Sequence, residues 1–295
     1  MTGDDRVLVR IRGASVNALD WHLMRRLPHL ISMLLGMLRS RVRGADMAGH
    51  VEAVGKNVAR FKPGDEVFGV GLGSLSEYAT TSEDRLAAKP RNLTFEQAAA
   101  LPIAGCTALQ GLRDKGQVKA GQRVLIYGAG GGVGTFAVQI AKSLGAHVTA
   151  VSSAANADLL HSIGADRVID YSKEDFTKSG QRWDVLFDIG ANRSLADCSR
   201  VLAQNGKHVF AGAPHGLWAL LSRLLKAQLM SRSGSQRIMF MARIRHEDLV
   251  TLKELVEGGK LSPVIDRQYS LREVPDAVRY VGARQARGKV VISVN

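Results

Sequence analysis

The stretch that decides the fold reads Arg123-Val-Leu-Ile-Tyr127, then Gly128-Ala-Gly-Gly-Gly-Val-Gly134, then Thr135-Phe-Ala-Val-Gln-Ile-Ala-Lys-Ser-Leu144. An apolar strand, a tight glycine turn and an amphipathic helix in this order are typical of the phosphate-binding start of a dinucleotide fold. His147-Val-Thr-Ala-Val151 supplies the next strand of a βαβ unit. The stretch therefore predicts a coenzyme-binding turn, and an ordinary glycine-rich βαβ turn is the alternative.

Each glycine in this turn has a separate expected task. Gly131 lets the backbone approach a pyrophosphate, and Gly134 lets the new helix pack tightly on the strand. The helix N-terminus offers unpaired N–H groups to the anion. Ala129 occupies the first position of the usual G-x-G-x-x-G pattern, so the match is incomplete. The predicted cofactor-binding residues of the turn are Gly131, Gly132, Val133 and Gly134.

Beyond the turn, strand and helix patterns alternate, which predicts a parallel, doubly wound sheet. The predicted strands there are 123–127, 147–151, 167–169, 184–188 and 207–211, with 238–241 at the sheet edge. The first hundred residues alternate like short, half-buried strands. One helix is predicted over 94–113, opened by Thr94 with Glu96 and Gln97 in its first turn.

Composition describes a globular protein of two domains, because 295 residues with 45% hydrophobic content can bury a large core. No window approaches a membrane span, and the acidic start Met1–Asp5 does not suit a signal peptide. Cys106 and Cys198 are too few for a disulfide framework or a four-ligand zinc site. We therefore expect a cytoplasmic protein with reduced thiols.

The net charge of +13 is concentrated in two segments, 22–43 and 215–245, which are rich in arginine, leucine and methionine. Basic amphipathic segments can lie on an anionic membrane or contact nucleic acid. Alternatively, their apolar face is core and their arginines are solvated. Nucleic-acid binding is not expected, because no zinc finger or aromatic RNA-binding motif accompanies them.

The chain resembles the zinc-independent, quinone-reductase-like (zeta-crystallin-like) branch of the medium-chain dehydrogenase/reductase superfamily. The motifs that carry the resemblance are Ala14-Ser-Val-Asn-Ala-Leu-Asp-Trp21, Gly44-Ala-Asp-Met-Ala-Gly49, Phe61-Lys-Pro-Gly-Asp-Glu-Val-Phe68, Ala98-Ala-Ala-Leu-Pro102, Thr107-Ala-Leu109, the glycine turn, Gly164-Ala-Asp-Arg-Val-Ile-Asp-Tyr171 and Ala286-Arg-Gly-Lys-Val-Val291.

The resemblance implies an α/β protein in which a Rossmann domain is inserted into a GroES-like partial β-barrel. Residues 1–103 and 243–295 would form the barrel, and 104–242 the cofactor domain. The active site would lie in the cleft between them. Relatives usually begin with an extra hairpin before the strand that starts here at Val7. Similar proteins often form homodimers through the last strand of the cofactor domain, here 237–241.

Zinc-dependent relatives carry a cysteine in the segment matching Asn17 and Ala18, and a histidine in the one matching Ala45. This chain has neither ligand there, so the resemblance implies no zinc. Without a metal, the protein has hydrogen bonds to stabilise negative charge on the acceptor oxygen. That limit favours electron-poor acceptors, so we expect hydride transfer to a quinone or an α,β-unsaturated carbonyl.

The resemblance also implies the catalytic candidates Asn17, Asp20 and His22. The Asn17 amide could donate to the developing oxyanion, or it could satisfy the local backbone of a turn. Asp20 would fix that loop. His22 could donate a proton or simply be exposed. Thr107 matches a family threonine beside the nicotinamide, or is an ordinary helix residue.

Coenzyme choice is argued from the end of the second strand of the cofactor domain, where NAD enzymes carry an acidic residue. Here Ser152, Ser153 and Asn156 follow that strand, with hydrogen-bond donors for a 2′-phosphate. The serines could instead cap a helix. By resemblance, Tyr171 touches the same phosphate, which favours NADPH over NADH. Gly190 and Ala213 follow two further strands and are predicted to line the nicotinamide half.

Two other functions stay open from the sequence. Within the enzyme class, the alternative acceptor is an alkenal or an enoyl thioester. Outside it, the chain could be a non-catalytic NADPH-binding protein that acts at a membrane surface or on nucleic acid through its basic segments.

Overall fold

The computed structural model describes residues 3–21, 44–190, 192–211 and 236–294. It divides into two compact units, which are Met1–Cys106 with Arg243–Asn295 (the first unit) and Thr107–Ala242 (the second unit). His22, Ala213, segment 22–43 and most of 215–245 lie outside the described residues. The predictions made for them therefore stay predictions.

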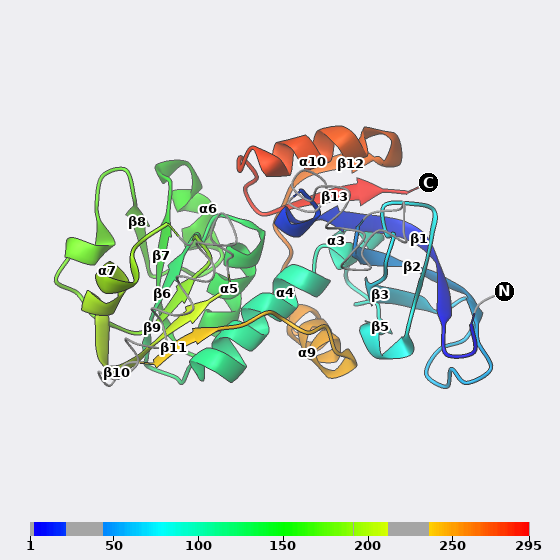
Figure 1. Ribbon diagram of the computed structural model, residues 1–295, viewed down its shortest axis with the longest axis horizontal. Coiled ribbons are helices and arrows are strands. Elements are labelled where there is room, and N and C mark those ends of the chain that lie inside the picture. Colours follow the sequence, from blue (N-terminus) through cyan, green and yellow to red (C-terminus); the bar gives the residue numbers. More distant parts are fainter. Residues whose placement is uncertain (1–2, 22–43, 191, 212–235, 295) are drawn as a thin grey trace, which may run out of the picture. The chain divides into compact units, whose positions relative to one another are not determined.

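The first unit is built on a mostly antiparallel sheet (Figure 1). β1 pairs antiparallel with β2, β4 and β13, and only β12 runs parallel to its described neighbour. Among the described residues its strands are β1 (Val7–Val16), β2 (Asp46–Val54), β3 (Glu66–Val70), β4 (Tyr78–Thr81), β5 (Leu86–Ala88), β12 (Ile265–Ser270) and β13 (Lys289–Ser293).

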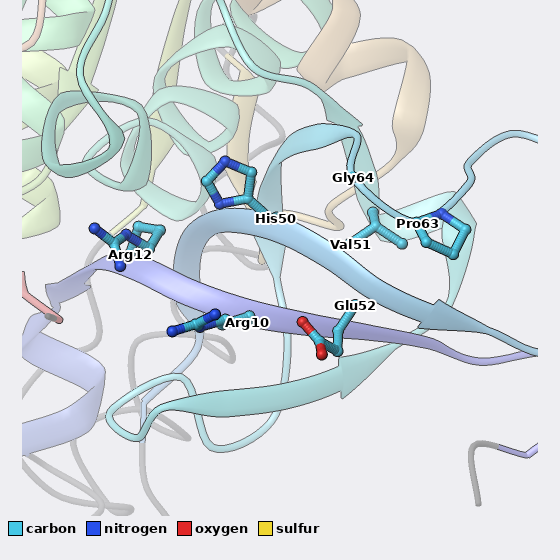
Figure 2. A pocket seen from close by; sticks show the side chains of 7 residues that line it. All are labelled: Arg10, Arg12, His50, Val51, Glu52, Pro63 and Gly64. Carbon is cyan, nitrogen blue, oxygen red and sulfur yellow. The ribbon is translucent and has the colours of Figure 1, made fainter.

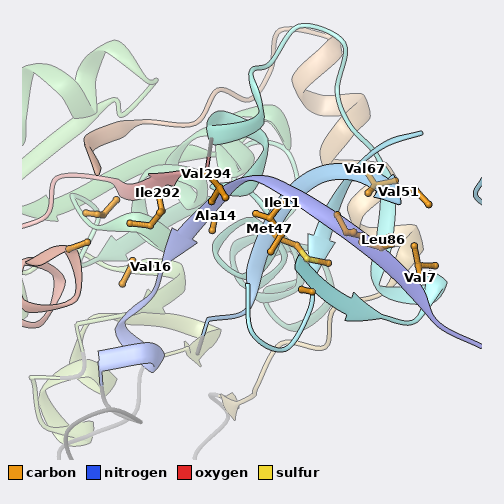
Figure 3. Close-up of a cluster of buried hydrophobic side chains, with 14 of the residues drawn as sticks. Val7, Ile11, Ala14, Val16, Met47, Val51, Val67, Leu86, Ile292 and Val294 are labelled. Carbon is orange, nitrogen blue, oxygen red and sulfur yellow. The ribbon is translucent and has the colours of Figure 1, made fainter. Parts of the chain in front are cut away.

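Alternate side chains of β1 form the core of this unit, since period-two patterning turns one face inward. Figure 3 shows Val7 and Ile11 of β1 with Met47 of β2 and Ile292 of β13, and each of these is at most 2% exposed. The apolar face of α10 (Val274–Gly282) packs on the same cluster through Ala277 and Val278. Because β1 and β13 pair at Val16↔Val290, the two sequence ends of the unit are joined in one sheet.

The prediction of one continuous helix over 94–113 is wrong, because the structure has two separate helices there. Thr94 does cap α3 (Phe95–Ala99) in a reciprocal box with Gln97, but α4 (Pro102–Leu109) is a separate helix. Pro102 explains the break, because proline has no N–H and disfavours helix in the preceding residue. A π-helical turn, Gln110–Gly116, then replaces the expected helix end.

The second unit contains a parallel sheet, which confirms the predicted doubly wound fold (Figure 1). The described strands lie in the order β11-β10-β9-β6-β7-β8, which is the Rossmann order 6-5-4-1-2-3. Their bounds are β6 (Arg123–Tyr127), β7 (His147–Ser152), β8 (Arg167–Asp170), β9 (Trp183–Asp188), β10 (Leu202–Phe210) and β11 (Gln236–Met239).

Helices α5 (Gly132–Ser143), α6 (Ala157–Ser162) and α7 (Leu195–Arg200) connect these strands. Strand order reverses between β6 and β9, and ligands of such sheets bind beyond the carboxyl ends at that point. In the part of the sheet that is described, β11 is an edge strand that begins two residues before the predicted one. In the described parts of the chain, no helix is long and apolar enough to cross a membrane.

Candidate active site

The glycine turn lies at the carboxyl end of β6, as the strand–turn–helix pattern predicts. Gly128 adopts φ +92°, a left-handed conformation that favours glycine. The N–H groups of Gly128 and Ala129 both donate to Val151 O, which ties the turn to β7. Gly131 is the N-cap of α5 and has no side chain to close the helix N-terminus. The backbone N–H groups at the start of α5 are therefore accessible to an anion.

Gly134 and Gly131 differ in what surrounds them. A Cβ on Gly134 would lie 2.3 Å from Gly128 O, so the helix packs too closely on the backbone of the turn for any side chain there. A Cβ on Gly131 would meet nothing nearer than Gly128 O at 3.7 Å. Protein packing thus requires a glycine at 134, whereas the space beside Gly131 is open. Gly132 and Val133 are half-buried in the first turn of α5.

Ser152, Ser153 and Asn156 form a connected group beside the turn. Asn156 Nδ2 donates to Ser152 Oγ at 2.8 Å and to Ser153 Oγ at 3.3 Å. A Cβ on Gly130 would lie 2.3 Å from Asn156 Nδ2 and 2.6 Å from Ser152 Oγ. Asn156 Oδ1 is buried and has no hydrogen-bond partner in the described part of the chain. This oxygen is an acceptor that a bound hydroxyl group would satisfy.

Tyr171 and Asp170 stand at the end of the neighbouring strand β8. Tyr171 is 53% exposed, and its N–H donates to Ser152 O at 3.1 Å. Asp170 is the register partner of Ser152. Hydrogen bonds from the Ser172 N–H and hydroxyl lower the pKa of Asp170, so its carboxylate is ionised at neutral pH. Sequence reasoning named Tyr171 at the end of this third strand but sought the acidic residue only after the second strand, so it missed Asp170.

Gly190 follows β9 and lies against β6. Its N–H donates to Tyr127 O, and a Cβ there would come within 3.0 Å of the Tyr127 ring. It therefore borders the switch point where the nicotinamide half was predicted. Thr107 lies on α4 and is half-buried.

In the first unit, Asn17 and Asp20 hold each other in a tight turn after β1. The Asn17 N–H donates to Asp20 Oδ2 at 2.7 Å, and the Asp20 N–H donates to Asn17 O at 3.0 Å. This is half of a capping box, with Asp20 reaching back to the N-cap. These two hydrogen bonds are the contacts expected if Asp20 fixes the loop, as the sequence predicts.

The Asn17 side chain belongs to a buried polar group that sequence reasoning missed. We call Ser15, Asn17, Asp46 and Lys289 the Asn17 cluster. Asp46 Oδ2 accepts from Ser15 Oγ at 2.8 Å and from Asn17 Nδ2 at 2.8 Å. Lys289 Nζ donates to Asn17 Oδ1 at 2.7 Å and lies 3.5 Å from Asp46 Oδ2. The Ile103 N–H occupies Asp46 Oδ1 at 2.9 Å.

Burial shapes the charges of this cluster. Asp46 is fully buried, and Lys289 and Asp20 are 3% and 6% exposed. Burial raises the pKa of Asp20 from its ordinary 3.8 to about 6; the Asn17 N–H and Lys289 oppose the rise, and Asp46 adds to it. Burial lowers the pKa of Lys289, and the carboxylates of Asp46 and Asp20 oppose that effect. The cluster and the neighbouring Asp20 thus place one lysine and two carboxyl groups beside an amide.

The donor set of the Asn17 cluster does not fit zinc. Zinc sites use thiolate, imidazole or open carboxylate ligands. Here the Asp46 carboxylate is already occupied by four donors, one of which is an ammonium group. The residues that could hold a metal among those described are Asp188, Cys198 and His208, whose ligand atoms lie within 4.8 Å of one another. His208 Nε2 lies 3.2 Å from Asp188 Oδ2, so these two buried side chains already contact each other directly.

A separate surface pocket of about 400 Å³ opens on the first unit. Figure 2 shows its lining residues Arg10, Arg12, His50 and Glu52, with Val51, Pro63 and Gly64. None of them belongs to the Asn17 cluster. Two guanidinium groups and a carboxylate do not suit an uncharged, apolar acceptor.

Two family models match this chain. The alcohol dehydrogenase GroES-like domain matches residues 3–91, and the zinc-binding dehydrogenase model matches residues 163–292. Together they cover parts of both units.

Similar proteins extend the match to the whole chain. A 2-methylene-furan-3-one reductase of Solanum lycopersicum is 34% identical over 98% of this chain and 72% of its own length. A mitochondrial NAD(P)H oxidoreductase of Mus musculus is 33% identical over 98% of this chain and 82% of its own length. The solved quinone oxidoreductase of Coxiella burnetii superposes with a TM-score of 0.88 at 28% identity, over 100% of this chain and 92% of that one. The chain belongs to the medium-chain dehydrogenase/reductase superfamily, in its quinone-oxidoreductase-like branch.

Proposed function

We propose that this protein is an NADPH-dependent oxidoreductase that transfers hydride to a quinone or an α,β-unsaturated carbonyl without zinc. The observation that carries the proposal is the Asn17 amide, whose oxygen and nitrogen are both held by buried charged groups. A donor fixed in this way suits an acceptor oxygen that becomes negative during reduction.

The second unit fits a nicotinamide coenzyme. Open space at Gly131 and close packing at Gly134 leave room for a pyrophosphate at the start of α5. The buried acceptor Asn156 Oδ1 fits a ribose hydroxyl, which can donate to it. When bound, the reduced nicotinamide would supply the hydride.

The preference for NADPH rests on Ser152, Ser153 and Tyr171, which offer donors and no carboxylate for a 2′-phosphate. Ser152 is buried beneath the turn, whereas Tyr171 is exposed at its edge. Asp170 opposes the preference, because its ionised carboxylate lies in register with Ser152. Comparing kcat/KM for NADPH and NADH tests this part, and a higher value for NADH contradicts it.

The acceptor class follows from the single amide donor. One well-aimed donor stabilises an oxyanion by about 3–4 kcal/mol, which is less than a metal ion supplies. Acceptors that are already electron-poor need the least additional stabilisation. The names of the tomato and Coxiella relatives, a 2-methylene-furan-3-one reductase and a quinone oxidoreductase, agree with this class.

A turnover assay tests the proposal. Purified protein with NADPH is given a matched panel of quinones, enones, enoyl thioesters and simple ketones, and coenzyme oxidation is followed by absorbance. We expect turnover with quinones or enones and little with ketones. Oxidation with enoyl thioesters alone would select the alternative acceptor class. No oxidation with any acceptor would contradict the proposal.

Exchange of Asn17 tests the residue. Asn17→Ala should lower kcat about 100-fold, because an oxyanion donor is lost, while the coenzyme KM stays within about twofold. Full turnover by Asn17→Ala would remove Asn17 from the mechanism.

A homodimer through β11 completes the proposal. β11 is the edge strand of the described sheet, and Met241 beyond it is 90% exposed. Paired edges would cover this strand. Light scattering after gel filtration should give twice the chain mass, and Met241→Lys should reduce it. A cytoplasmic location is likewise a prediction, and the mouse relative is mitochondrial.

A further inference from the structure

Lys289 makes the longest-range contact of the site. It is the first residue of β13, it is 3% exposed, and its Nζ reaches Asn17 Oδ1 across 272 positions of sequence. The strand that follows, Val290–Ile292, is fully apolar and buried. A lysine at the head of such a strand would ordinarily extend into solvent, because burying an ammonium group is costly. Here it points into the cluster instead.

The contacts of Lys289 close a ring with Asn17 and Asp46. Lys289 donates to the amide oxygen, and the amide nitrogen donates to Asp46 Oδ2 at 2.8 Å. If the amide were reversed, its NH₂ would face the ammonium group and its oxygen would face the carboxylate. Both contacts would be repulsive, so the amide has one orientation. Of the two hydrogens on Nδ2, Asp46 takes one, and within the described part of the chain the second is left for the acceptor.

Stability alone does not explain a lysine here. Buried ion pairs are often no more stable than apolar residues of similar volume, so a hydrophobic side chain at 289 with a neutral residue at 46 would serve as well. The charged groups that face the Lys289 ammonium are Asp46 from β2 and Asp20 from the turn after β1. Both carboxyl groups favour the ammonium form. The positive charge of Lys289, which lies next to the amide oxygen, also withdraws electron density from Nδ2. This strengthens the remaining N–H as a hydrogen-bond donor.

We propose that Lys289 is the positioning residue of the active site: its ammonium group fixes and polarises the Asn17 amide, whose N–H then stabilises the acceptor oxygen. The inference rests on the proposed role of Asn17. The competing role is purely structural, in which Lys289 does no more than neutralise Asp46.

The test is a double-mutant cycle on turnover. Lys289→Met keeps most of the length of the side chain and removes its charge, and it should lower kcat about 100-fold with the coenzyme KM within about twofold. In the Asn17→Ala background the same exchange should lower kcat by less than about twofold, because the residue acts through Asn17. Equal losses in both backgrounds, or full turnover by Lys289→Met, would overturn the proposal.

A matched variant separates positioning from folding. Asp46→Asn/Lys289→Met removes both charges, so it should unfold at a temperature close to that of the wild type. Its kcat should remain low, since Asn17 Oδ1 has lost its donor. Recovery of wild-type kcat in this variant would assign Lys289 the structural role. If neither variant folds, Lys289→Arg is measured in both backgrounds, because arginine still neutralises Asp46: a fall in kcat that occurs with Asn17 and not in Asn17→Ala supports positioning, and an unchanged kcat or an equal fall in both backgrounds contradicts it.

The wild type and Asn17→Ala are measured alongside. No turnover by the wild type would show that the proposed function fails. Turnover that depends on Asn17 but not on Lys289 would show that only this inference fails.

Discussion

The Asn17 cluster and the glycine turn differ in the kind of interaction on which each depends. The Asn17 cluster depends on side chains that are present, gathered from β1, β2 and β13 across most of the chain. The glycine turn depends on side chains that are absent, within seven consecutive residues. The first is electrostatic and long-range, and the second is steric and local. We therefore expect substitutions to couple over long distances in the first unit and to act position by position in the second.

The largest expected effect comes from breaking the buried pair. Asp46→Ala leaves the Lys289 ammonium without its carboxylate and the Ser15, Asn17 and Ile103 donors without their acceptor. The free energy of unfolding should fall by about 3–5 kcal/mol. Denaturant titration measures this, with the partly exposed Asp184→Ala in the second unit as a control. A loss below 1 kcal/mol would contradict a long-range electrostatic cluster.

The pH dependence of stability sharpens the same point. Because the pKa of Asp20 is raised to about 6 in the folded state, the folded protein binds the proton more readily than the unfolded chain between about pH 4 and pH 6. The contribution of Asp20 to stability is thus present at low pH and is lost as the pH rises through 6, to a total of about 3 kcal/mol.

Asp20→Asn removes this titration and keeps an acceptor for the Asn17 N–H. The variant should therefore gain stability relative to the wild type as the pH rises from 4 to 7. Urea titrations of both proteins at several pH values supply the difference. A difference independent of pH would mean that the pKa of Asp20 is not raised.

The glycine turn offers a paired test of local, steric encoding. Gly134→Ala should lower the free energy of unfolding by about 1–3 kcal/mol, because its Cβ would meet backbone at 2.3 Å. Gly131→Ala should unfold at the wild-type temperature yet bind NADPH at least about tenfold more weakly, since its methyl group enters the open space. Thermal unfolding and calorimetric titration separate the two. Equal loss of stability in both variants would contradict the contrast.

The smallest expected effect concerns Asp170. Asp170→Asn removes a carboxylate in register with Ser152, so the kcat/KM ratio of NADPH to NADH should rise about two- to fivefold. Asp184→Asn is the matched control, because this carboxylate binds the Arg123 N–H at the opposite end of the sheet. A ratio that does not change would remove Asp170 from coenzyme choice.

The sequence predicts the local features of the molecule better than the long-range ones. The doubly wound sheet and the glycine turn were predictable because their signals lie within a few neighbouring residues. Asp46 and Lys289 were not assigned roles, although both stand in the motifs that carry the family resemblance. Their partners are distant in sequence, so no local pattern shows which residues they contact. A charged residue within a buried strand, such as Asp46 beside Met47 and Ala48, was the available signal.

The broken helix at residues 100–101 shows a different limit. The apolar and capping pattern over 94–113 runs through this point without interruption, whereas Pro102 restricts the backbone enough to separate two helices. Likewise, Asp170 was overlooked because strand neighbours become visible only when the sheet is assembled. The local sequence pattern indicates individual helices and strands. Which residues of neighbouring strands lie side by side can be seen only in the structure.

The close contact of Gly130 with Asn156 and Ser152 ties two functions of the second unit together. A carboxylate introduced at position 152 to recruit NADH would press against the turn that is predicted to carry the pyrophosphate. We therefore expect an exchange of Ser152 for an acidic residue to disturb the glycine turn as well as the proposed preference for NADPH. Engineers who wish to reverse it should begin at the exposed Tyr171, where there is room for a new side chain.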